Sequence, residues 1–289
     1  MPVRQSHSLD QSPLYKMRSR SKLAKLLKIA PRELRLLEAD VDPYTEFDTP
    51  KKSGHGTRHV ENPRRDLKRV QARLARILSW ITPPDFLFCP VKRRCYVSNA
   101  AAHKDNRVVQ CLDIKSFFPS TPQRRVFWFL HKVLKCKRDI AGLLAKLACY
   151  QGHLPTGSPL SPIMAYFAFY DLWQEIAEFC DERGHTFTVY IDDVTVSGER
   201  VSKGDMWRIR KMIHRRGLTA HKAKTYVDSP AEITGVIARG GELVAPFRQH
   251  HKKFMAKDLL DKAPIEEREA LLGRISGIEG QIKQIAEKN

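Results

Sequence analysis

The order of apolar and polar positions predicts alternating helices and strands. An apolar side chain recurs every three or four residues over 67–81, which predicts an amphipathic helix with a basic outer side. Val108–Ile114 is a short apolar run bounded by polar residues, so it predicts a buried strand that ends near Asp113. Residues 187–196 alternate well enough for a β-hairpin, with Asp192 and Asp193 adjacent at its tip.

Capping signals add further elements to this pattern. Pro31 opens a helix, and Thr121-Pro122 and Ser161-Pro162 each predict an N-cap followed by proline at the first helical position. The helix that Ser161-Pro162 opens should run to about Asp181. Residues 43–66 are rich in Pro, Gly, His and charge, which predicts a hairpin or loops with a flexible basic turn over 51–56. The remaining predicted elements are helices at 22–29, 139–150, 206–216 and 266–288, and a strand at 232–237.

Composition narrows the class of partner. The 289 residues hold 51 Lys and Arg against 32 Asp and Glu, a net charge of +19 that favours nucleic acid first and an anionic membrane surface second. The hydrophobic fraction of 42% suffices for a core and excludes whole-chain disorder. No apolar run approaches the roughly 20 residues of a membrane span, and no signal-peptide centre is present. Six cysteines without metal-ligand spacing predict reduced thiols in a cytoplasmic protein.

The adjacent carboxylates at the hairpin tip carry the clearest chemistry. Asp192 and Asp193 repel each other, and their apolar flanks give them little solvent, so a divalent cation would explain the arrangement. Asp113, at the end of the earlier strand, is the candidate further ligand. Two strands that present Asp113 and Asp192 side by side would hold two metals about 3.5–4 Å apart. In isolation, an Asp-Asp turn is more often an ordinary polar turn.

Four segments, in order, resemble the motifs of the reverse transcriptase family. They are Leu112–Ser120, Leu154–Pro162, the Tyr-x-Asp-Asp box Tyr190–Asp193, and Gly217–Thr225. Two more signatures resemble bacterial retron reverse transcriptases: Asn99-Ala100-Ala101-Ala102-His103 fits Asn-Ala-x-x-His, and Ile233-Thr234-Gly235 resembles Val-Thr-Gly. The likeness runs from about residue 32 to residue 284.

The resemblance implies an α+β fold in the shape of a right hand, with fingers, a palm of antiparallel sheet backed by helices, and a short helical thumb. The implied division is a basic N-terminal arm at 1–30, interleaved fingers and palm at 31–235, and the thumb at 236–289. No length remains for an endonuclease, an RNase H or a maturase domain.

The resemblance also assigns catalytic roles. It implies catalysis and binding of two Mg²⁺ ions by Asp113 and Asp192, with a metal bond from the backbone carbonyl of Ile114 and a supporting role for Asp193. Lys224 would contact or protonate the departing pyrophosphate, although it is one of 51 basic residues.

Contacts with the nucleotide and with RNA are implied in the same way. Arg58 would grip the triphosphate, Phe118 would exclude a ribose 2′-OH, and Thr156 and Gly157 would lie near the nascent base pair. Alternatively, Arg58 is an ordinary surface arginine, Phe118 is a core aromatic, and Gly157 is part of an ordinary loop turn. The implied RNA-binding residues are Asn99, His103, Thr234 and Gly235, with a capped helical turn as the alternative for 99–103. The family usually has Gln at position 156 and, in bacterial relatives, Asn at position 166; this chain has Thr156 and Tyr166.

The function implied is RNA-directed DNA synthesis from dNTPs on a structured non-coding RNA, primed from a 2′-OH within that RNA. The product would be a branched RNA–cDNA molecule, often within an antiphage defence unit that includes an effector protein. Two alternatives stay open: another bacterial defence reverse transcriptase with a different primer or template, and a non-catalytic RNA-binding or scaffold relative. An RNA-making polymerase is disfavoured because Phe118 opposes a 2′-OH.

Overall fold

The computed structural model describes residues 6–50 and 56–288, so the basic turn expected over 51–56 lies, except for Gly56, outside the described residues. The chain forms two compact units, each assembled from three segments. The first unit comprises Met1–Pro84, Ile114–Ile176 and Ile209–Ala220. The second unit comprises Asp85–Asp113, Ala177–Arg208 and His221–Asn289.

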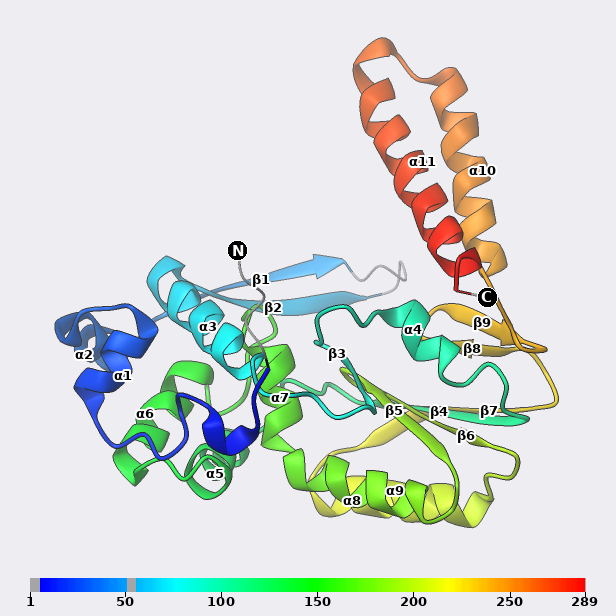
Figure 1. The fold of residues 1–289 in the computed structure, drawn as a ribbon. Helices are drawn as coiled ribbons and strands as arrows, with labels where there is room; N and C mark the ends of the chain where they lie inside the picture. Colours follow the sequence, from blue (N-terminus) through cyan, green and yellow to red (C-terminus); the bar gives the residue numbers. More distant parts are fainter. Residues whose placement is uncertain (1–5, 51–55, 289) are drawn as a thin grey trace. The chain divides into compact units, whose positions relative to one another are not determined.

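The first unit is mainly helical (Figure 1). Its elements are η1 (Leu9–Gln11), α1 (Arg20–Leu27), α2 (Pro31–Ala39), the antiparallel pair β1 (Tyr44–Pro50) and β2 (Thr57–Pro63), α3 (Arg65–Leu78), α5 (Gln123–Trp128), the π-helical turn η2 (Phe129–Val133), α6 (Arg138–Ala148) and α7 (Ser161–Ala168). Two longer helices, α8 (Tyr170–Asp181) and α9 (Lys203–Arg215), contribute residues to both units.

The amphipathic helix predicted from residue 67 onward is α3. Its apolar positions, including Val70 and Leu74, are buried while Lys68 and Arg69 are exposed. Gln71 lies among the buried positions, where its amide donates to the Tyr44 hydroxyl (2.7 Å) and the Leu147 carbonyl (2.8 Å). A buried amide of this kind is tolerated because its polar atoms are paired.

Both predicted Thr/Ser N-caps are wrong. Helix α5 begins at Gln123, and the buried Thr121 hydroxyl donates to the Phe117 carbonyl (2.7 Å). Ser161 is the first residue of α7, and its hydroxyl donates to the Pro155 carbonyl (2.6 Å). The long helix predicted to reach Asp181 is two helices, since α7 ends at Ala168. The buried hydroxyls of Thr121 and Ser161 thus donate to backbone carbonyls earlier in the chain instead of capping a helix.

The N-terminal arm is packed within the first unit over much of its described length. Leu14, Leu23 and Ala24 have no exposed surface, and α1 is capped by the Ser19 side chain, which accepts from the Lys22 backbone N–H. The predicted short basic helix is therefore present, and its apolar side belongs to the core of this unit.

The second unit is built on a five-stranded sheet in the order β3-β5-β6-β4-β7. Its strands are β3 (Leu87–Cys89), β4 (Val108–Ile114), β5 (Thr186–Tyr190), β6 (Asp193–Gly198) and β7 (Ala220–Val227). Strands β5, β6 and β4 pair antiparallel, and β3 runs parallel to β5. The strand predicted at 108–114 and the hairpin predicted at 187–196 are both confirmed.

A smaller sheet and a helical hairpin complete this unit. The strands β8 (Ala231–Ile233), β9 (Val236–Arg239) and β10 (Glu242–Val244) pair antiparallel, and α4 (Tyr96–Ala101) precedes β4. Helices α10 (Phe247–Lys262) and α11 (Ile265–Ala286) run side by side (Figure 1). The single strand predicted at 232–237 is wrong, because Thr234 and Gly235 turn the chain with φ of 45° and 88°.

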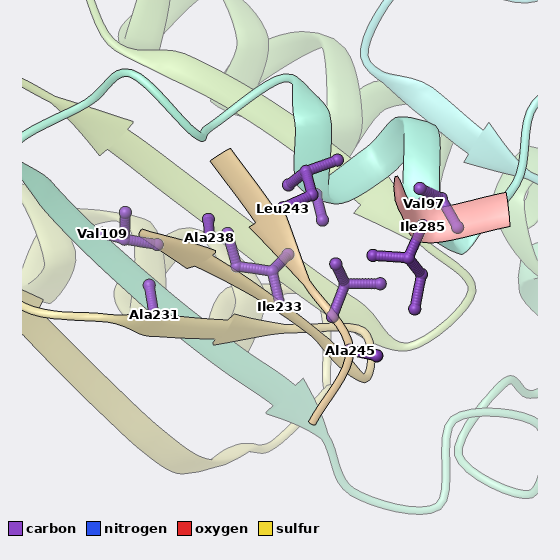
Figure 2. Packing of buried hydrophobic residues seen from close by; sticks show 10 residues of the cluster. Val97, Val109, Ala231, Ile233, Ala238, Leu243, Ala245 and Ile285 are labelled. Carbon is purple, nitrogen blue, oxygen red and sulfur yellow. The ribbon is translucent and has the colours of Figure 1, made fainter. Parts of the chain in front are cut away.

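A compact apolar cluster joins these smaller elements. Side chains from α4, β4, the three short strands and the end of α11 converge around Ile233 and Leu243 (Figure 2). The strands β9 and β10 belong to this sheet, and the helical pair that follows them starts at Phe247.

Candidate active site

The register of the large sheet brings the predicted carboxylates together in the second unit. Strands β4 and β6 pair Asp113 with Asp193, and strands β5 and β6 pair Tyr190 with Asp193. Asp192 therefore occupies the two-residue turn between β5 and β6. The strand residue paired with Asp113 is Asp193, and Asp192 directly precedes it in the turn.

The turn itself has an uncommon backbone. Ile191 has a φ of 59°, a value that β-branched residues rarely adopt, whereas hairpin turns of two residues usually place glycine or asparagine there. Such strain costs roughly 1–3 kcal/mol and persists where the surrounding structure over-determines it, most often at functional sites. Here it lies between Tyr190 and the two aspartates.

The carboxylates share a partly buried site. Burial raises the pKa of Asp193 to about 7, and the neighbouring carboxylates of Asp192 and Asp113 add to the rise. Lys224 and Lys222 act in the opposite direction but do not cancel it. Ionised oxygens crowded in this way are stabilised by a bound cation.

The donor set fits a hard divalent metal. Mg²⁺ at polymerase sites is held through one or two carboxylates together with substrate phosphates. Within residues 6–50 and 56–288, no group of three or more His, Cys, Asp or Glu side chains is arranged to hold a metal by itself. Asp113 and Asp193 nevertheless occupy paired positions of β4 and β6, with Asp192 beside them in the turn, so carboxylates of this group could hold a metal together with substrate phosphates.

Two residues of β7 hold the Asp113 side chain. His221 Nδ1 lies 3.0 Å from Asp113 Oδ1 and 3.2 Å from the Asp113 carbonyl oxygen, and Lys222 Nζ lies 3.9 Å from Oδ2. Both neighbours reach the same carboxylate because Lys222, with a φ of 49°, departs from the regular strand. Neither contact was predicted from the sequence.

An open pocket of about 290 Å³ extends from these carboxylates across the second unit. Its lining includes Asp113 and Asp193, the predicted catalytic Lys224, and the turn formed by Thr234 and Gly235. The structure thus places two residues expected to contact RNA in the same pocket as two of the predicted metal ligands.

Comparison with known proteins decides the family. The model of the family described as reverse transcriptase (RNA-dependent DNA polymerase) matches residues 49–238. The chain is 30% identical over 243 residues to the retron Ec86 reverse transcriptase of Escherichia coli, covering 81% of this chain and 75% of that protein. This chain belongs to the reverse transcriptase family. Among its members it is of the retron type, and it is an RNA-directed DNA polymerase.

Two further relatives have the same character. The chain is 25% identical over 210 residues to the retron Se72 reverse transcriptase of Salmonella heidelberg, covering 68% of this chain and 55% of that protein. It is 28% identical over 270 residues to the retron Mx65 reverse transcriptase of Myxococcus xanthus, covering 84% of this chain and 61% of that protein. The matched region therefore spans less than two thirds of the length of each of these two relatives.

The residues expected to contact the nucleotide all lie in the first unit of the reverse transcriptase. Arg58 is exposed on β2, and the ring of Phe118 is partly buried and stacks on the buried Phe117 with centroids 6.1 Å apart. Thr156 and Gly157 follow one another in a loop that contacts β2 through hydrogen bonds. Ile114 is the last residue of β4, directly after Asp113.

The structure corrects the roles of two signature residues. His103 has no exposed surface, and its ring nitrogens lie 2.6 Å from Ser197 Oγ and 2.8 Å from Thr188 Oγ1. Burial lowers its pKa to about 3, so the ring is neutral. An RNA contact by this side chain is therefore wrong for this conformation: His103 ties the end of α4 to β5 and β6.

Asn99 is likewise internal. Its side chain is 1% exposed, and its amide donates to Thr234 Oγ1 (3.3 Å), which in turn donates to the Tyr96 carbonyl (3.0 Å). Asn99 links the two retron signatures by holding the Thr234–Gly235 turn against α4. A direct RNA contact by Asn99 is wrong in this conformation, whereas Thr234 and Gly235 do reach the pocket.

No helix in the part of the chain that the structure describes is long and apolar enough to cross a membrane.

Proposed function

We propose that this reverse transcriptase copies a structured non-coding RNA, encoded beside it, into a small single-stranded DNA. Synthesis starts from a 2′-OH within that RNA, so the product is a branched RNA–DNA molecule. The protein acts within an antiphage defence unit that includes an effector protein, and it resides in the cytoplasm. The retron-type relatives support this proposal, and the paired aspartates of β4 and β6 are the observation that carries the chemistry.

The charge and the surface of the chain also favour a nucleic-acid partner. The net charge of +19 gives a salt-sensitive attraction to a phosphate backbone. On α10, the exposed aromatic side chains Phe247 and Phe254 stand among basic residues such as Lys252. Interleaved cations and aromatic rings are typical of surfaces that bind nucleic-acid strands. We therefore propose that nucleic acid contacts this helix.

The chemistry divides among residues of this chain. Asp113 and Asp192 would hold two Mg²⁺ ions with the Ile114 carbonyl, and Asp193 would support them. When bound, such ions lower the pKa of a primer hydroxyl and neutralise charge on the departing pyrophosphate. Lys224 lines the same pocket as Asp113 and Asp193, where its ammonium would stabilise the pyrophosphate. Arg58 would bind the triphosphate, and Gly157 would lie against the nascent base pair.

The decisive experiment expresses the protein together with its flanking genomic DNA and isolates small nucleic acids. We expect an RNA-linked single-stranded DNA that a debranching enzyme shortens, which would establish both polymerisation and 2′-OH priming. The matched control carries Asp192→Asn and Asp193→Asn and should yield no such DNA. A product that forms only in the wild type but resists debranching would contradict 2′-OH priming while leaving the polymerase in place.

Phe118 should set the preference for deoxynucleotides. If its ring excludes the ribose 2′-OH, Phe118→Ala should raise ribonucleotide incorporation relative to deoxynucleotide incorporation by about 10- to 100-fold, the range expected when a pocket loses one excluding group. Single-nucleotide primer extension with each substrate measures this ratio. Phe47→Ala, which removes an exposed aromatic ring from β1, is the matched control and should leave the ratio unchanged. Unaltered discrimination in Phe118→Ala would remove Phe118 from this role.

A further inference from the structure

The loop that carries Thr156 is fastened to strand β2 by five polar contacts within the first unit. The Thr156 hydroxyl donates to the His59 carbonyl (2.9 Å) and accepts from the Glu61 backbone N–H (3.2 Å). The backbone N–H groups of Thr156 and Gly157 donate to the Glu61 carboxylate (3.2 Å) and carbonyl (3.1 Å). His153 Nε2 lies 2.8 Å from the other carboxylate oxygen of Glu61. We call this set of contacts the β2 clasp.

The clasp is closely packed. Glu61 is only 5% exposed, so its carboxylate depends on these partners for its hydrogen bonds. A Cβ atom at position 157 would lie 2.6 Å from the Glu61 carbonyl oxygen and 2.9 Å from Asn62 Cα, both of them backbone atoms. Only glycine permits this approach, which explains why the residue after Thr156 lacks a side chain.

The geometry changes the expected role of Thr156. A hydroxyl has one proton to donate, and the Thr156 proton is used on the His59 carbonyl. His59 directly follows Arg58 in β2, so this hydrogen bond fixes the backbone beside the arginine that we assign to the triphosphate. The same hydroxyl and the Glu61 contacts fix β2 to the loop that carries Gly157.

We propose that Thr156 is a positioning residue. It holds β2, and with it Arg58, at the correct distance from the loop that carries Gly157. This inference rests on the proposed function, in which Arg58 binds the triphosphate. It replaces a direct nucleotide contact by the Thr156 side chain with an indirect one. The clasp then determines how tightly the incoming dNTP binds, while bond formation depends on the carboxylates of the other unit.

Single-turnover incorporation of one dNTP on an RNA template tests this role, because it separates nucleotide affinity from the maximal rate. Thr156→Val keeps the shape of the side chain but removes both hydroxyl contacts. We expect its apparent Kd for dNTP to rise about five- to tenfold, as for the loss of one or two hydrogen bonds. The maximal rate and the template–primer affinity should stay within about twofold. Thr156→Ser, which restores the hydroxyl, should return the apparent Kd to the wild-type value.

Thr45→Val is the matched control. Thr45 is an exposed threonine of β1 in the same hairpin, and its hydroxyl makes no hydrogen bond with any described residue. It should leave the apparent Kd unchanged. Glu61→Gln provides a second variant of the clasp, with the same expected direction, and decides the question if Thr156→Val does not fold.

The outcomes separate this inference from the proposed function. If the wild type adds no nucleotide, the proposed function fails. If the wild type is active and both clasp variants bind dNTP normally, only the positioning role fails. A clasp variant that loses rate, dNTP affinity and melting temperature together, without rescue by Thr156→Ser, would indicate a purely structural role and overturn the inference.

Discussion

Asp113→Asn should reduce nucleotide addition by at least about 1,000-fold while leaving the fold intact. The asparagine has the same shape, and its amide oxygen can still accept a hydrogen bond from His221, which lies 3.0 Å from Asp113 Oδ1 in the wild type. What it lacks is the charge that a divalent metal requires. Removing a single group that stabilises transition-state charge already costs 100- to 1,000-fold, and loss of a metal ligand should cost at least as much.

Primer extension on an RNA template with dNTPs and Mg²⁺ measures this loss, and circular dichroism verifies the fold. The control is Asp105→Asn, the same chemical change at an exposed acid of the second unit that does not line the pocket of Asp113 and Asp193. The control should retain wild-type activity. If Asp113→Asn kept more than about a tenth of the activity, Asp113 would not be a metal ligand, and the assignment of the whole carboxylate site would be wrong.

The pattern of the chain predicted those elements whose apolar positions face one core. The strand at 108–114 and the helix beginning at residue 65 are examples, because each buries one stripe or run of side chains. Helix α10 was missed because it has no such stripe. Phe254 and Met255 are exposed, only Ala256 is buried, and an ion pair between Lys253 and Glu279 (2.9 Å) links the helix to α11.

The turn at Thr234-Gly235 was missed for a different reason. Residues 232–237 are apolar enough for one strand, and β-branched residues on either side conceal the break. The glycine was the available signal, because a glycine within a strand pattern often marks a turn or a bulge. Recognising it as a turn would have predicted the β8–β9 hairpin.

The candidate site was predictable as far as its carboxylates. A strand end and a hairpin tip supplied Asp113, Asp192 and Asp193, but the choice of Asp193 as the partner of Asp113 depends on register, which the pattern leaves open. His221 lies 108 residues from Asp113 in sequence, and their contact follows from β7 lying beside β4. No local pattern carries that information. The burial of Asn99 and His103 also depends on distant strands.

The raised pKa of Asp193 gives the second large prediction: the metal-free enzyme should become less stable as pH rises from about 4 to about 7. The carboxyl has a pKa of about 7 in the folded chain against a usual 3.8, chiefly through burial. Between these values the folded state keeps a proton that the unfolded state has lost, so the free energy of unfolding falls as pH increases. The loss is complete above about pH 7, and three pKa units correspond to at most about 4 kcal/mol.

Asp193→Asn should therefore stabilise the metal-free protein while impairing catalysis. The asparagine resembles the protonated acid, so its melting temperature should exceed that of the wild type by about 5 °C or more at pH 8 and by little at pH 4 or below. Mg²⁺ should raise the melting temperature of the wild type more at pH 8 than at pH 6, since it binds the ionised carboxylates, and should raise that of the variant less. Scanning calorimetry across this pH range, with and without Mg²⁺, measures both effects, and Asp105→Asn again serves as the control.

Equal melting temperatures for wild type and variant at pH 8 would mean that Asp193 is ionised at no cost. The cationic side chains of Lys222 and Lys224 would then suffice to stabilise the crowded carboxylates. The electrostatic argument for a metal at this site would be wrong.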